Sequence, residues 1–127
     1  MENAQKIRPK YLDLFSIRLP VPGWVSILHR ISGFGLFLCL PLLLWLLDNS
    51  LHSRSSFARF QSIISIPLVK LILLGLVWAF LHHLLAGLRH IALDLDWGVS
   101  LGAGRATAKL VLIVSLALTA VLGAMLW

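Results

Sequence analysis

With 127 residues, of which 59% are hydrophobic and only 13% charged, the chain has too little polar surface for a soluble domain of its length. The formal net charge of +6 would indicate a nucleic acid partner for a soluble protein, but here the basic residues sit at the ends of apolar runs, where they mark the cytoplasmic side of a membrane. We therefore expect an all-α integral membrane protein that binds no nucleic acid.

The chain divides into a polar arm and a membrane domain. Pro9 and Pro20 interrupt residues 1–21, which makes a long helix there unfavourable. We interpret 1–21 as a cytoplasmic N-terminal arm and 22–127 as a three-helix transmembrane domain.

Three apolar runs approach or exceed the roughly 20 residues that cross a bilayer. The predicted helices cover approximately 22–48, 66–94 and 106–127. We expect a polar connection with a short interfacial helix near 57–63, and a glycine-rich loop at 95–105. The basic residues favour a cytoplasmic N-terminus and second loop, and a periplasmic C-terminus.

The second predicted helix carries histidines where ionisable groups are costly. His83, Gly87 and His90 follow each other at spacings of four and three residues, so they share one helix face. A neutral imidazole is a good axial ligand for haem iron, and a glycine one turn away leaves room for a flat macrocycle. The alternative is that these histidines only form hydrogen bonds to a neighbouring helix.

The first predicted helix carries Ser26, His29, Arg30 and Gly33 on one side. This pattern indicates a small polar pocket just below the membrane surface, although an arginine that reaches up to the headgroups would give the same pattern. Antiparallel packing would bring His29 close in depth to His83. The groups near the surface could then pair with haem propionates while the deeper imidazole holds iron.

At this point the sequence resembles a known family, the larger membrane-anchor (cytochrome b) subunit of succinate dehydrogenase, respiratory complex II. The resemblance covers nearly the whole chain and is carried by Arg8-Pro9, Leu12-Asp13-Leu14, Ile17-Arg18, Ser26-Ile27-Leu28-His29-Arg30-Ile31-Ser32-Gly33 and His83-x3-Gly87-x-Arg89-His90-x3-Asp94. It implies three transmembrane helices that pack with a second three-helix anchor subunit around one shared haem b. It also implies an iron–sulfur subunit and a flavoprotein subunit on the cytoplasmic face of a bacterial inner membrane.

The resemblance also implies roles for individual residues. His83 corresponds to the axial ligand of the haem iron, and the second ligand would come from the partner anchor. Ser26 and Arg30 correspond to ubiquinone-site residues, while His29, Arg89 and His90 fall in the haem environment. One departure is His82, which stands where an aromatic residue is expected; the shared face with Gly87 and His90 favours His83 as the ligand.

We therefore expect a subunit that passes electrons from succinate oxidation to ubiquinone and is not catalytic alone. The alternatives are the anchor of a quinol:fumarate reductase, a haem-free structural anchor, and an ion pathway lined by His82, His83 and Asp94. The lack of carboxylates at mid-membrane disfavours the ion pathway.

Overall fold

The computed structural model describes residues 17–127 and shows an all-α fold, with no strand in that range. Its helices are α1 (Val21–Leu51), α2 (Arg54–Ile64), α3 (Pro67–Asp94) and α4 (Leu101–Leu126). The arm expected at 1–21 lies mostly outside the described residues. Helices α1, α3 and α4 are each long and apolar enough to cross a membrane, so the prediction of three spanning helices is confirmed.

Proline starts two of the long helices. Pro22 lies in the first turn of α1 and Pro67 is the first residue of α3. A proline there loses no hydrogen bond, and its fixed φ already suits a helix. At the other end, α1 continues to Leu51, beyond the predicted end at 48. The Asn49 and Ser50 side chains donate back to carbonyls of the preceding turn instead of ending the helix.

The loop predicted at 95–105 is shorter than expected. Asp96 and Gly98 turn the chain with positive φ values of 62° and 74°, and α4 already begins at Leu101. The Ser100 hydroxyl accepts a hydrogen bond from the Ala103 amide at 3.3 Å and so caps the new helix. This cap offsets part of the low helix propensity of the glycines that follow it.

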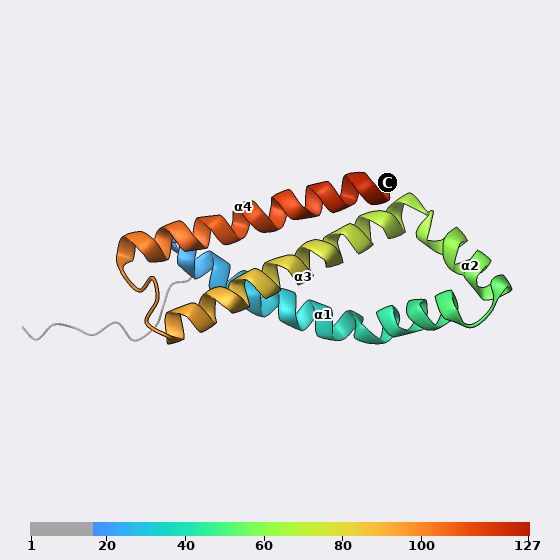
Figure 1. The fold of residues 1–127 in the computed structure, drawn as a ribbon, viewed down its shortest axis with the longest axis horizontal. Helices are drawn as coiled ribbons and strands as arrows, with labels where there is room; N and C mark the ends of the chain where they lie inside the picture. The colour runs from blue at the N-terminus through green and yellow to red at the C-terminus, as the bar shows by residue number, and fades with distance from the viewer. Residues whose placement is uncertain (1–16) are drawn as a thin grey trace, which may run out of the picture.

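The short helix expected near 57–63 is present and slightly longer, as α2. Ser53 and Ser56 form a reciprocal capping box: the Ser56 amide donates to the Ser53 hydroxyl at 3.1 Å, and the Ser53 amide donates to the Ser56 hydroxyl at 2.9 Å. Figure 1 shows α2 crossing from the end of α1 to the start of α3, where these two helices have moved apart.

The three long helices pack together most closely near the start of α1. Helix α3 packs against both α1 and α4 (Figure 1). A small core there combines Val25 of α1, Ala86 of α3, and Ala108 and Val111 of α4. Most large apolar side chains of the described residues are exposed instead. This distribution suits helices whose outer surfaces face lipid or other subunits.

One close α3–α4 contact yields a test of the packing. A Cβ on Gly123 would lie 2.9 Å from Leu74 Cδ1, whereas a Cβ on Gly75 would meet nothing within 4 Å. We expect Gly123→Val to destabilise the protein by about 1 kcal/mol, the low end for overpacking, because the flexible end of the Leu74 side chain can shift. Gly75→Val is the matched control and should have little effect. Thermal unfolding in detergent compares them, and equal stability of the two variants would contradict the packing.

Candidate functional site

The candidate site is built around the His83 imidazole on α3. Its Nδ1 lies 3.0 Å from the backbone carbonyl oxygen of His29 on α1. A carbonyl oxygen can only accept a hydrogen bond, so Nδ1 must carry the proton in this contact. The other ring nitrogen, Nε2, then keeps its lone pair. The backbone of α1 thus selects the tautomer that can bind a metal through Nε2.

Two small residues on α1 make this contact possible. The Ser32 side chain is 6% exposed; its hydroxyl donates to the His29 carbonyl at 2.9 Å and lies 3.4 Å from His83 Nδ1. Gly33 provides space, since a Cβ there would lie only 2.6 Å from His83 Cε1. The imidazole can therefore approach α1 this closely only beside a glycine.

The His29 side chain completes a cluster of three imidazoles. Its ring stacks on His83 with centroids 4.2 Å apart and planes at 11°, and it meets His90 at 5.1 Å and 52°. Gly87 lies beneath it, because a Cβ there would be 3.4 Å from His29 Nε2. The structure thus brings His29 together with the three α3 positions that the sequence placed on one face.

His82 occupies a different environment from its neighbour. Its side chain is 0% exposed and lies beside Trp78, with ring centroids 5.3 Å apart. Neither His82 ring nitrogen has a hydrogen-bond partner within the described part of the chain. A macrocycle outside the helices cannot reach this imidazole, whereas His83 is only partly buried. The geometry therefore favours His83 over His82 as a ligand.

Ser26 and Arg30 lie one turn apart on α1. Ser26 is half-buried and Arg30 is exposed. Within residues 17–127, neither side chain forms a hydrogen bond, so both keep their polar groups for something outside the described chain. Arg30 directly follows His29 in the chain, so Ser26 and Arg30 lie on the same part of α1 as the imidazole cluster.

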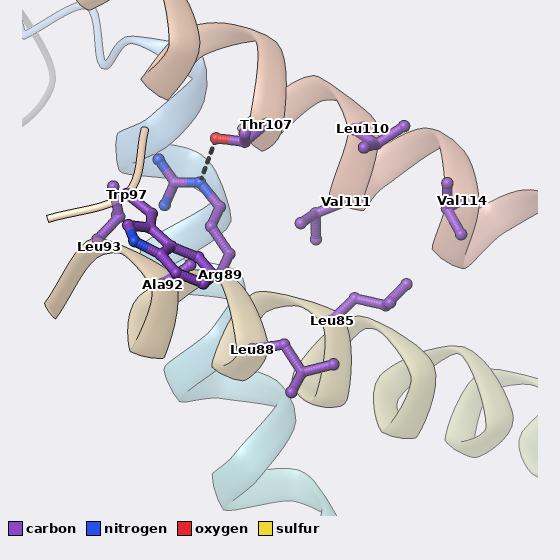
Figure 2. A pocket seen from close by; sticks show the side chains of 10 residues that line it. All are labelled: Leu85, Leu88, Arg89, Ala92, Leu93, Trp97, Thr107, Leu110, Val111 and Val114. Carbon is purple, nitrogen blue, oxygen red and sulfur yellow. Dashed lines mark hydrogen bonds between the residues drawn. The ribbon is translucent and has the colours of Figure 1, made fainter. Parts of the chain in front are cut away.

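Arg89 does not join the imidazole cluster. Its Nε donates to Thr107 Oγ1 at 3.1 Å, and its Nη2 donates to the Gly104 carbonyl at 3.1 Å. Figure 2 shows the guanidinium directed toward α4. Of the residues predicted for the haem environment, the structure therefore stacks His29 on His83, places His90 beside His29, and directs Arg89 to the α3–α4 contact.

These features describe a helical membrane protein in which the packing of two helices fixes the orientation of one histidine ring. Residues 4–122 match the family model described as succinate dehydrogenase/fumarate reductase transmembrane subunit. The chain therefore belongs to this family, and it is a multi-pass membrane protein and a membrane anchor of such a complex. The match confirms the resemblance that the sequence motifs carried.

Individual relatives agree with the family. The chain is 40% identical to a succinate dehydrogenase cytochrome b556 subunit of Coxiella burnetii over 94% of this chain and 97% of the relative. It is 36% identical to the protein of that name from Paracoccus denitrificans, over 74% and 72% of the two chains. A third, from Rickettsia felis, is 30% identical over 91% and 90%.

Sequence reasoning did not assign Ser32 and Gly33 their roles in orienting His83. A signal was present: Ser32 is the only hydroxyl-bearing residue between Ile31 and Leu47 of α1. A hydroxyl alone in such a run needs a partner. The bond that Ser32 donates to the His29 carbonyl is local to α1, but its contact with His83 depends on how α1 and α3 pack and cannot be read from either helix alone.

The Gly33 contact yields a prediction with a matched control. In Gly33→Ala the new methyl group overlaps the His83 ring, so we expect a loss of about 1–3 kcal/mol of stability. A Cβ on Gly35 meets nothing within 4 Å, so Gly35→Ala should be neutral or stabilise the helix by up to ~1 kcal/mol. Thermal unfolding in detergent measures both effects, and equal stability of the two variants would contradict the contact.

Proposed function

We propose that this chain is the haem b-binding membrane anchor of a succinate:ubiquinone oxidoreductase and forms part of its quinone-reduction site. The observation that carries the proposal is the His83 Nδ1 contact with the His29 carbonyl. Family membership and relatives named as cytochrome b556 subunits support it.

The His83 environment fits a haem ligand. Histidine ligands almost always donate their other ring N–H to a carbonyl, carboxylate or water, which fixes the ring and raises its basicity. Within the described residues, no three His, Cys, Asp or Glu side chains gather as a protein-only metal site would need. A haem iron needs only axial ligands from protein, so one imidazole from this chain is sufficient. We propose that the second axial ligand comes from a partner anchor subunit.

When bound, haem b supplies one-electron redox chemistry. The residues of this chain orient it. His83 presents Nε2, while the His29 carbonyl and Ser32 keep the proton on Nδ1. We propose that His29 and His90 donate from their rings to the haem propionates. We do not extend this role to Arg89, because its guanidinium is directed toward α4.

Ser26 and Arg30 are proposed to bind ubiquinone. The Ser26 hydroxyl can donate to a quinone carbonyl, and the Arg30 guanidinium can stabilise the negative charge that develops on a quinone oxygen during reduction. Arg30 remains charged in a low-dielectric site and offers a planar fork of donors. Its exposure on α1 leaves these donors open to a ligand or to a partner subunit.

The remaining components follow from the same proposal. The chain carries no flavin or iron–sulfur motif, so succinate is oxidised in a flavoprotein subunit and electrons arrive through an iron–sulfur subunit. Both are proposed to dock on the cytoplasmic face of a bacterial inner membrane, with the C-terminus of this chain periplasmic. The family description also includes fumarate reductase subunits, which makes a quinol:fumarate reductase anchor the second candidate. Electron flow measured with each quinone type distinguishes the two.

The ligand assignment is tested by replacing each of the adjacent histidines. We expect His83→Ala in the intact complex to abolish or shift the haem absorption, because it removes the prepared Nε2. His82→Ala removes a buried side chain and should lower stability while retaining more haem. Reduced-minus-oxidised spectra, normalised to the amount of assembled complex, give the comparison.

Two results would refute the assignment of His83. One is equal loss of haem from both variants, and the other is greater loss from His82→Ala. A haem-free wild-type complex would instead favour the structural-anchor alternative.

The quinone site is tested at Arg30. We expect Arg30→Lys, and more mildly Ser26→Ala, to lower ubiquinone reduction while succinate oxidation by a water-soluble acceptor is unchanged. Loss of one charge-assisted hydrogen bond costs ~1.5–3 kcal/mol, which corresponds to a roughly ten- to hundredfold loss of rate. Steady-state assays across quinone concentrations measure it.

Arg105→Lys is the control, because it makes the same change at another exposed arginine, on α4. It should leave both activities unchanged. If Arg30→Lys behaves like this control, Arg30 only reaches toward the headgroups and does not belong to the quinone site.

A further inference from the structure

A pocket lies between α3 and α4, and the functions proposed above do not use it. Its volume is about 390 Å³, and Figure 2 shows the side chains that line it. Most of the wall is aliphatic and is contributed by both helices, including Leu85 and Leu88 of α3 and Leu110 and Val114 of α4. The only charged side chain in the wall is Arg89.

The Arg89 guanidinium is fixed at one end of this pocket. Its bonds to Thr107 Oγ1 and the Gly104 carbonyl hold it against the first two turns of α4. A guanidinium has five N–H donors, so others remain for a ligand. Within residues 17–127, the structure gives Arg89 no ion pair with a carboxylate. The pocket therefore has the Arg89 guanidinium at one end and an apolar slot that extends from it between α3 and α4.

The charged end of the pocket lies at the membrane surface. Trp97, in the turn that joins α3 to α4, contributes to the wall and is 72% exposed. Tryptophan is enriched at the boundary between headgroups and hydrocarbon. Arg105 and Lys109 are exposed on the first turns of α4, at the same end. Leu85 and Val114 lie further along their helices, inside the hydrocarbon region.

We propose that this pocket binds one anionic phospholipid. Its phosphodiester pairs with the Arg89 guanidinium, and one acyl chain lies in the slot between Leu88 and Leu110. The charge of Arg89 selects this occupant: an apolar helix of another subunit would cover the guanidinium without supplying a counter-charge, which is costly in a membrane. A free phosphate would satisfy the cation but leave the aliphatic wall uncovered. Only a ligand with both parts complements the whole pocket.

The test uses the intact complex purified in mild detergent, with bound lipid measured by native mass spectrometry. The probes are phosphatidylglycerol and phosphatidylcholine with the same acyl chains. We expect the wild-type complex to retain phosphatidylglycerol in preference to phosphatidylcholine. Arg89→Gln should reduce that retention roughly tenfold, the size expected for one lost charge-assisted contact. Arg105→Gln removes an equal charge at the same end of α4 and should retain the lipid.

Val114→Phe makes the test independent of any effect of Arg89 on assembly. It fills the slot and leaves the guanidinium in place, and we expect a similar loss of phosphatidylglycerol. Three outcomes would overturn the proposal: equal binding of both lipids, equal effects of Arg89→Gln and Arg105→Gln, or full retention in Val114→Phe. Efficient crosslinking of Leu110→Cys to another subunit would also overturn it, since a protein helix would then cover the pocket.

Discussion

The site depends on the hydrogen bond between the His83 ring and the backbone carbonyl of His29. This bond joins residues 54 apart in the sequence and fixes both the position and the tautomer of the imidazole. Gly33 permits the close approach of the ring, Ser32 donates to the same His29 carbonyl, and the His29 ring stacks on the His83 ring. In a medium without water, a polar group held so completely has little freedom to find another partner.

The adjacent residues His82 and His83 lie in different environments because successive side chains point in different directions from a helix. A helix turns by 100° per residue, since 3.6 residues complete a turn. His82 therefore points into the interior and His83 toward α1, although they are chemically identical. Periodicity alone distinguished them, because only His83 lies on the side of Gly87. Which of the two sides packs against α1 and which is enclosed became visible only in the assembled helices.

The sequence was sufficient for the helices and for part of the site. Apolar runs, prolines at two helix starts and the spacing of His83, Gly87 and His90 define these features locally. The ends of helices were less predictable: Asn49 and Ser50 bond within α1, and Ser100 starts α4 earlier than the glycines indicated. The direction of Arg89 was not predictable, because its acceptors belong to α4 and the motif on α3 contains no information about them.

The order of the helices along the chain has a consequence for synthesis. Both partners of the His83–His29 bond lie on α1 and α3, which precede α4 in the sequence. The ribosome therefore delivers the donor and the acceptor of this bond before the last transmembrane helix has been made. Helix α4 is needed later, to supply Thr107 and Gly104 as acceptors for Arg89. Cotranslational insertion thus makes the partners of the His83–His29 contact available before those of the Arg89 contacts.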